Sequence, residues 1–149
     1  MKTVIFDLDG TLAIIDKRRA LANKPDGGIN WDVFFDPNNI QLDEPNPSVI
    51  STFQALKSAG FKVGIFSGRD SISRKETNQW LEANGVQPDF FKMRPQGSHT
   101  PDDVLKKKWL MEMIKDGHDI MCVYDDRDKV VKMWRDNDIP CFQVNYGDF

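Results

Sequence analysis

The sequence has no apolar run close to the length that a membrane-spanning helix requires. Such a helix needs about 20 consecutive apolar residues, whereas the apolar stretches here are short and are interrupted by charged residues. After Met1 the chain leads directly into a strand-like run, without the pattern of a signal peptide. We therefore expect a cytoplasmic protein with no membrane partner.

The sequence also has few cysteines and histidines, and its net charge is small. The two cysteines, Cys122 and Cys141, lie inside apolar runs, which is typical of buried free thiols. The two histidines, His99 and His118, lack the spacing of metal ligands. A formal net charge of -3 excludes an overall attraction to nucleic acid, so binding of a polyanion would need a local basic surface.

Alternating strand and helix patterns run along most of the chain, whose 149 residues suit a single domain. Strands are predicted at residues 2–7, 61–66, 90–93, 120–124 and 141–144. Helices are predicted between them at 46–59, 71–84, 101–116 and 129–137, with Thr100 as the cap of the third helix. This alternation predicts an α/β fold, a Rossmann-like three-layer sandwich around a mainly parallel five-stranded sheet.

Residues 13–45 break the alternation and are predicted to form an irregular insert, a long loop with one short helix. The insert is too short for an independent domain, so the fold is expected to have no cap or a minimal one. It contains three aromatic residues, Trp31, Phe34 and Phe35, which suit either a local hydrophobic plug or base stacking. The other tryptophans occupy apolar helical positions and are expected in the core.

Polar residues follow the predicted strands at the edge where open α/β sheets bind ligands. These residues are Asp7-Leu8-Asp9-Gly10-Thr11, Ser67-Gly68-Arg69, Lys106 and Asp125-Asp126. Residues two apart in an extended chain point to the same side. Asp7 and Asp9 could therefore attack a substrate and transfer a proton, or bind a divalent cation, or do both.

The four motifs, in this order, resemble those of the haloacid dehalogenase superfamily of phosphatases. The resemblance implies that Asp7 is the nucleophile and forms an aspartyl phosphate. It implies that Asp9 is the general acid and then the base, while Ser67 and Lys106 hold the phosphate oxygens. An acid at Asp9 favours phosphoester chemistry, because a dehalogenase has no alkoxide leaving group to protonate.

The same resemblance implies a Mg²⁺ cofactor bound by oxygen ligands. The expected ligands are the carboxylates of Asp7 and Asp125 and the backbone carbonyl of Asp9. Asp126 is expected as a second carboxylate ligand or as a group that orients the first. The cation would screen the repulsion between an anionic nucleophile and an anionic phosphate.

Most of the chain is also similar to the 3′-phosphatase domains of phage polynucleotide kinase/phosphatases. The matching stretches include FDLDGTLA, SGRDS, DDVLKKK, YDDRDKVVKMWR and QVNYGDF, whereas residues 24–44 fit poorly. This similarity implies that Arg18 and Arg69 contact the phosphate or the neighbouring nucleotide, and that Asp102 orients Lys106. The predicted substrate-binding residues are Thr11, Arg18, Gly68, Arg69 and Asp102.

The predicted function is removal of a 3′-phosphate from a polynucleotide end, DNA or RNA, in nucleic-acid repair. The sequence has no G-x-x-x-x-G-K-[ST] motif, so we expect 5′-phosphorylation to need a separate kinase, with a ligase as a further functional partner. One alternative is a phosphatase of the same superfamily for a small nucleotide or sugar phosphate, which the absent cap disfavours. A second is an inactive nucleic-acid-binding module, which the intact set of catalytic residues argues against.

Overall fold

The computed structural model describes residues 1–149 and contains a sheet of five strands in the order β5–β4–β1–β6–β7. The strands are β1 (Lys2–Phe6), β4 (Lys62–Asp70), β5 (Phe91–Arg94), β6 (Asp119–Asp125) and β7 (Cys141–Gln143). Each pair of neighbouring strands in this sheet is parallel. The predicted Rossmann-like α/β fold is therefore confirmed.

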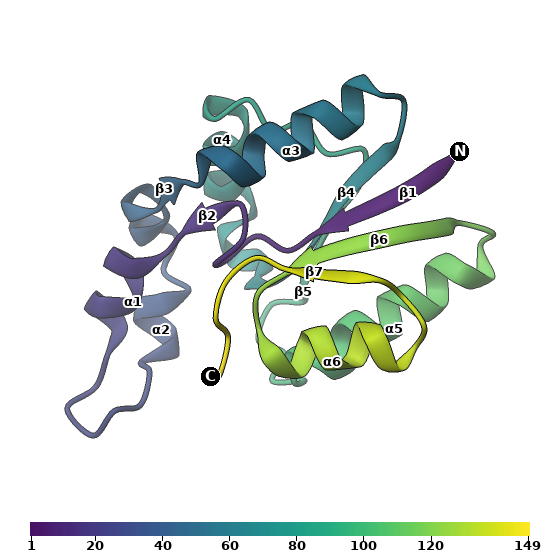
Figure 1. The fold of residues 1–149 in the computed structure, drawn as a ribbon. Helices are drawn as coiled ribbons and strands as arrows, with labels where there is room; N and C mark the ends of the chain where they lie inside the picture. The colour runs from purple at the N-terminus through teal and green to yellow at the C-terminus, as the bar shows by residue number, and fades with distance from the viewer.

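Helices cover both faces of the sheet (Figure 1). On one face lie α3 (Pro47–Ser58) and α4 (Arg74–Ala83), the latter preceded by a short 3-10 helix η2 (Ser71–Ser73). On the other face lie α5 (Asp102–Lys115) and α6 (Asp128–Asp136). None of the helices has both the length and the apolar character needed to cross a membrane.

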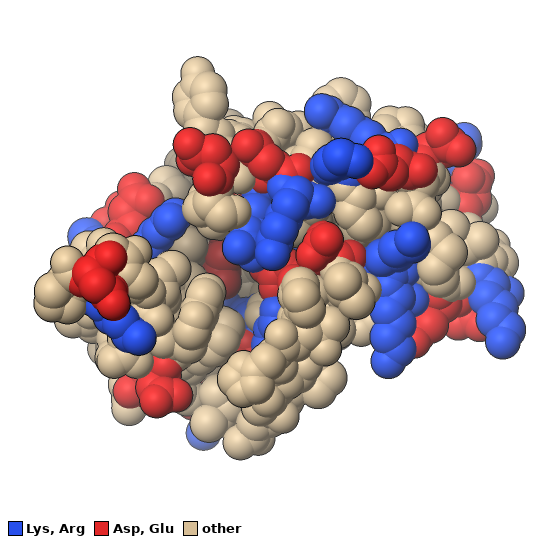
Figure 2. All heavy atoms as spheres, turned by 90° about the horizontal axis from the view of Figure 1, so that it is seen from below, with Lys and Arg blue, Asp and Glu red and all other residues tan.

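Residues 13–45, which we call the arm, are more ordered than the sequence predicts. They form β2 (Ala13–Ile14), α1 (Asp16–Ala22), α2 (Trp31–Phe34), the 3-10 helix η1 (Pro37–Leu42) and β3 (Glu44–Pro45). The prediction of one short helix was wrong because side-chain caps from Asn30 and Asp36 support helices too short to show a hydrophobic period. Strands β2 and β3 pair antiparallel and hold the two ends of the arm together. The arm lies at the left in Figure 2, where a hollow separates it from the rest of that face.

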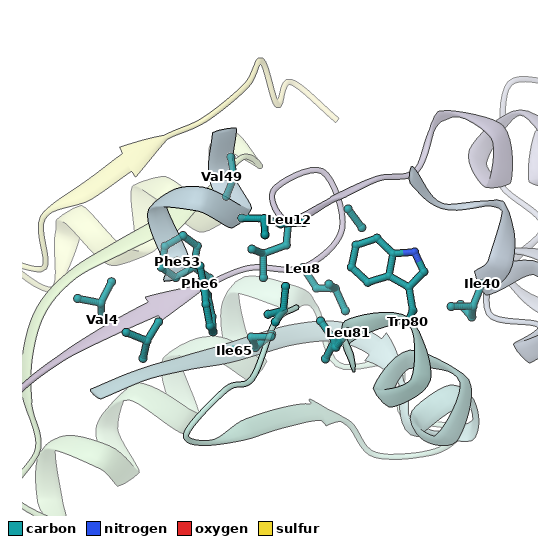
Figure 3. Packing of buried hydrophobic residues seen from close by; sticks show 14 of the residues in the cluster. Val4, Phe6, Leu8, Leu12, Ile40, Val49, Phe53, Ile65, Trp80 and Leu81 are labelled. Carbon is teal, nitrogen blue, oxygen red and sulfur yellow. The ribbon is translucent and has the colours of Figure 1, made fainter. Parts of the chain in front are cut away.

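The core joins the arm to the sheet. A cluster of 15 buried residues packs α3 and α4 against the sheet, and a second cluster of 13 does the same for α5 and α6. The first cluster includes Ile40 of the arm, which lies next to Trp80 of α4 (Figure 3). The Trp80 indole Nε1 also donates to the Asp43 carbonyl at 3.0 Å. Trp80, Trp109 and Trp134 are all buried, which confirms their predicted place in the core.

Two predicted boundaries differ from the structure near the carboxyl edge of the sheet. Strand β4 continues to Asp70, so the Ser67-Gly68-Arg69 motif lies within the strand, where its register with β5 shifts. Helix α5 is preceded by Pro101, and Thr100 does not cap it. The Thr100 carbonyl instead accepts a hydrogen bond from Arg94, which holds residues 95–100 against the end of β5.

Candidate active site

A cleft of about 910 Å³ opens at the carboxyl ends of β1, β4 and β6, with the arm as one wall. Acidic and basic atoms are visible in this hollow in Figure 2. The predicted site residues that line the cleft are Asp7, Asp9, Gly68, Asp102, Lys106, Asp125 and Asp126. Thr11, Arg18, Ser67 and Arg69 are buried behind them. The fold therefore brings all four motifs to one place, in two layers.

Lys106 connects the first and fourth motifs. Its ammonium group, brought in by α5, lies 2.9 Å from Asp7 Oδ1 and 3.0 Å from Asp125 Oδ2. Burial by itself would lower the pKa of Lys106, but the charges of Asp125 and Asp7 raise it above its usual range. Thr11 Oγ1 donates to the second oxygen of Asp7 at 3.1 Å. The Asp7 carboxylate is therefore held at both oxygens, beside a permanent positive charge.

Three carboxylates form a compact acidic group at the floor of the cleft. Asp7, Asp125 and Asp126 each offer an oxygen, and these oxygens lie within 4.8 Å of one another. Burial, followed by the charge of Asp125, raises the pKa of Asp7 well above its usual value, and burial raises the pKa of Asp126 to about 6. Mutual repulsion among buried oxygen ligands suits a small, hard divalent cation. The Asp9 side chain is not part of this group.

Asp9 belongs to a second network, in which two arginines converge on it. Arg18 Nη2 lies 2.6 Å from Asp9 Oδ1, and Arg69 Nη2 contacts the same oxygen. Burial by itself would raise the pKa of Asp9, but Arg18 and Arg69 hold it below its usual range. Both arginine side chains are fully buried. Neither arginine lines the cleft, so the predicted contact of Arg18 and Arg69 with substrate is not prepared in this structure.

Asp43 completes this network and was missed by the sequence analysis. Its carboxylate accepts from Arg18 Nε and Nη2, both at 2.9 Å, and from Arg69 Nη2 at 3.0 Å. Asp43 lies in the arm, immediately after η1, in a segment with no periodic pattern. Its only sequence signal is an acid within the same insert as Arg18, which does not distinguish it from the other acids there.

Asp102, which was expected to orient Lys106, is held by two further arginines. Arg94 Nη2 contacts one carboxylate oxygen of Asp102, and Arg127 Nη1 donates to the other at 3.0 Å. A side chain at Gly68 would collide with the Asp102 carboxyl group, so the glycine permits this close approach to β4. Asp102 therefore acts on Lys106 through its charge, while it ties α5 to the ends of β5 and β6.

Two buried side chains fix the backbone and carboxylates of the remaining motifs. Ser67 Oγ accepts from the Arg69 amide at 3.0 Å, which shapes the second motif from within. Trp134 Nε1 donates to Asp125 Oδ2 at 3.2 Å, and the Asp126 amide donates to Asp125 Oδ1 at 2.8 Å. Asp125 therefore has one orientation before any ligand binds.

Gly10 allows the first motif to turn beneath the fourth. Its φ of +82° is in the left-handed region that L side chains rarely adopt. A Cβ atom at this position would also collide with the carboxylate of Asp126. The glycine is therefore required both by its backbone conformation and by the closeness of the two acidic motifs.

Comparisons with known proteins agree with this geometry. Residues 1–149 match a family model described as the polynucleotide kinase PNKP phosphatase domain. The chain is 30% identical over 142 residues to a putative bifunctional polynucleotide kinase/RNA ligase of Autographa californica nuclear polyhedrosis virus, covering 93% of this chain and 18% of that protein. It therefore spans only a small part of this curated relative.

Two solved structures are also similar to this chain. A chain of the Pnkp1/Rnl/Hen1 RNA repair complex superposes with a TM-score of 0.83 at 34% identity, covering 99% of this chain and 43% of that one. A haloacid dehalogenase-like hydrolase, SP0104 of Streptococcus pneumoniae, gives a TM-score of 0.69 at 13% identity, covering 96% and 84%. The second match shows the shared fold.

Proposed function

Since the chain belongs to the family of polynucleotide kinase PNKP phosphatase domains, we propose that it removes the 3′-phosphate from polynucleotide ends with the help of Mg²⁺. The observation that carries this proposal is the position of Asp7 at the floor of an open cleft, between Lys106 and the acidic pair Asp125-Asp126. Haloacid dehalogenase-type phosphatases share this fold, and an aspartate nucleophile beside a lysine suits phosphoryl transfer.

In the proposed reaction a carboxylate oxygen of Asp7 attacks phosphorus, and the bond from phosphorus to the 3′-oxygen breaks. Lys106 neutralises charge on the non-bridging oxygens, where phosphoryl transfer needs it. Asp9 protonates the departing 3′-oxygen. It then removes a proton from the water that attacks the aspartyl phosphate, which releases inorganic phosphate and restores the Asp7 carboxylate.

The residues present fit a magnesium ion. Asp7 and Asp125 would bind it through carboxylate oxygens, together with the Asp9 backbone carbonyl, and Asp126 would bind or orient it. When bound, Mg²⁺ screens the repulsion between nucleophile and phosphate and polarises a phosphoryl oxygen. Lys106 supplies positive charge at the same place, since it contacts Asp7 and Asp125 directly.

The two arginines on Asp9 determine which of its roles is ready at rest. With Arg18 and Arg69 holding its pKa low, Asp9 is a carboxylate, the form required to remove a proton from water. The first step needs the protonated form. An approaching phosphate dianion raises the pKa of a neighbouring carboxyl group, so substrate binding favours uptake of that proton.

A polynucleotide end is the substrate that best agrees with the family and with the shape of the site. The arm lines one side of the cleft without enclosing it as a separate domain would, so a chain can extend outward. The similar proteins are described as a kinase/RNA ligase and as a component of an RNA repair complex. We therefore propose RNA ends as the first substrate to test, and joint action with a kinase and a ligase. The two buried free thiols suit a cytoplasmic setting.

Phosphate release from 3′-phosphorylated RNA and DNA oligonucleotides tests the proposal. Each oligonucleotide is compared with its 5′-phosphorylated twin and with a 3′-mononucleotide, in Mg²⁺ and in EDTA, and Asp7→Asn serves as the inactive control. Release from the 3′ end alone, dependent on Mg²⁺ and absent in the variant, supports the assignment. Release from the mononucleotide but from neither oligonucleotide keeps the chemistry and overturns the polynucleotide substrate.

A further inference from the structure

Trp31 differs from the other tryptophans in its exposure. The chain has four tryptophans; Trp31 is 52% exposed, whereas Trp80, Trp109 and Trp134 are at most 9% exposed. Trp31 begins α2 and lines the same cleft as Asp7 and Lys106. Its ring therefore lies on the arm wall of the proposed active site, with about half of its surface accessible.

The Trp31 ring packs against two phenylalanines of the arm. It stacks on Phe35, with centroids 5.5 Å apart and an interplanar angle of 25°, and meets Phe34 edge to face at 5.5 Å. Phe34 is 7% exposed, and the Arg18 guanidinium lies 4.4 Å from its ring centroid. The aromatic group predicted as either a plug or a stacking surface thus divides by exposure: Phe34 is almost fully buried in the cleft wall, whereas Trp31 offers an exposed ring to the same cleft.

Contacts continue from this aromatic group to the catalytic acid. Arg18 Nη1 donates to the Phe34 carbonyl at 3.0 Å, while its Nη2 binds Asp9. A buried arginine that bridges α2 and Asp9 restricts the movement of Trp31 relative to the nucleophile. The ring therefore needs little reorganisation to receive a ligand, which lowers the entropic cost of binding.

The chemistry of the cleft changes from one part to another. Its floor holds the Lys106 ammonium and the carboxylates, whereas Ile15, Ile29 and Trp31 contribute apolar surface on the arm side. A ligand that fills it must have an anionic phosphate for the floor and a flat apolar group for the wall. The terminal nucleotide of a polynucleotide has both, and a volume of about 910 Å³ is ample for one nucleotide.

We propose that Trp31 binds the base of the 3′-terminal nucleotide by stacking, so that the arm is the base-binding part of the substrate site. This inference rests on the proposed polynucleotide 3′-phosphatase function. Stacking uses the face of the base, which every base has, so the arm accepts ends of any sequence. An end that lacks its terminal base loses this contact and becomes a poor substrate.

A kinetic cycle between the tryptophan and the base tests the proposal. Two 3′-phosphorylated oligonucleotides are compared, identical except that one has an abasic sugar at the 3′-terminal position. Trp31→Ala is expected to lower kcat/KM on the intact end by about 5- to 160-fold, the range for one base–aromatic stack. It is expected to change kcat/KM on the abasic end by less than about twofold, and Trp31→Phe to restore most of the activity. Equal losses on both ends would overturn the proposal, because they would indicate a purely structural role.

Tryptophan fluorescence gives a second measurement that does not depend on turnover. In the inactive Asp7→Asn background, the intact 3′-phosphorylated oligonucleotide is expected to quench emission, and the abasic one much less. Trp31→Phe should remove that quenching, because the other tryptophans are buried. Leu21→Ala is the control: Leu21 is 56% exposed on α1 of the same arm and does not line the cleft. Quenching that persists in Trp31→Phe would contradict stacking on Trp31.

The outcomes separate the two proposals. If the wild-type protein releases phosphate from 3′ ends but Trp31→Ala affects both ends equally, the stacking contact is wrong and the enzymatic function stands. If the wild-type protein releases phosphate from the mononucleotide only, the polynucleotide function is overturned, whereas the base contact, which a mononucleotide also offers, is overturned only if quenching by that mononucleotide persists in Trp31→Phe.

Discussion

Arg69 Nη2 donates to both Asp9 and Asp43, so one nitrogen joins the proposed catalytic acid to the arm. Arg18 Nη2 makes the same pair of contacts. Two carboxylates and two guanidiniums therefore balance each other in a buried cluster. The charge state of Asp9 depends on this cluster, and through Asp43 it depends on the folding of the arm.

Removing the Asp43 charge is expected to weaken both folding and catalysis. Asp43→Asn leaves one of two buried arginines without full compensation, and breaking a buried pair costs up to about 3 kcal/mol of unfolding free energy. Burial raises the pKa of Asp43, which offsets part of that cost. The arginines would then shift toward Asp9, and kcat should fall by about 10- to 100-fold. Urea unfolding and phosphate release measure the two effects. Asp16→Asn, an exposed acid at the start of α1, is the matched control and should change neither. An Asp43→Asn protein with unchanged kcat would show that Asp9 does not need this support.

Asp7→Asn is expected to separate activity from stability. Loss of the proposed nucleophile should lower phosphate release by about 10⁴-fold or more. The fold should keep its stability or gain some, because burial and Asp125 raise the pKa of Asp7, which means that its charge is unfavourable in the folded protein without metal. Thermal unfolding in EDTA measures this. A marked fall in Tm would indicate that the Asp7 contact with Lys106 outweighs the repulsion.

The stabilisation by magnesium is expected to grow as the pH rises. Asp126 has a folded pKa of about 6, above its ordinary value of 3.8, so the folded protein binds the extra proton. The stability from that proton is complete below about pH 4 and is lost as the pH rises through 6. Mg²⁺ binds the ionised carboxylates and competes with the proton. The increase in Tm on adding Mg²⁺ should therefore be larger at pH 7.5 than at pH 5. An equal increase at both pH values would place the bound ion away from this cluster.

Comparing alanine substitutions at two glycines measures how much unfolding free energy depends on the close approach of Gly10 to Asp126. Gly10 and Gly60 both have positive φ, at +82° and +95°, but a Cβ meets nothing within 4 Å at Gly60 and collides with Asp126 at Gly10. Gly60→Ala should cost about 1–2 kcal/mol, the backbone strain alone, and leave activity unchanged. Gly10→Ala should cost more than this and disable phosphate release, because Asp126 must move. Equal losses of unfolding free energy would show that Asp126 yields freely.

The sequence predicts those site residues that lie at the ends of strands. Asp7, Ser67 and Asp125 each end or lie near the end of a buried strand, and parallel strands bring such ends to one edge. Lys106 was predicted from the resemblance to the superfamily's lysine motif, and α5 brings it to Asp7. The order of these motifs along the chain therefore predicts that they meet at one edge of the sheet, as they do in the cleft.

The contacts between arginines and acids could not be predicted in the same way. Arg18 binds Asp43 within an insert that has no hydrophobic period, and Arg94 captures Asp102 across a loop. Each pairing depends on the three-dimensional path of a short irregular segment, which local propensity does not specify. For this reason Asp43, Arg94 and Arg127 were missed.

The pairing of β2 with β3 brings the arm back to the point where it left the sheet, so the length of its far end has no effect on the register of the core. That far end is the exposed turn at 24–28, closed by the bridge between Asn23 and Ile29, and none of residues 24–28 lines the cleft. Exposed loop tips of this kind tolerate insertions. A fluorophore or an affinity tag placed there would travel with the arm and leave the catalytic groups untouched, which makes the turn an attachment point for following the enzyme on its substrate.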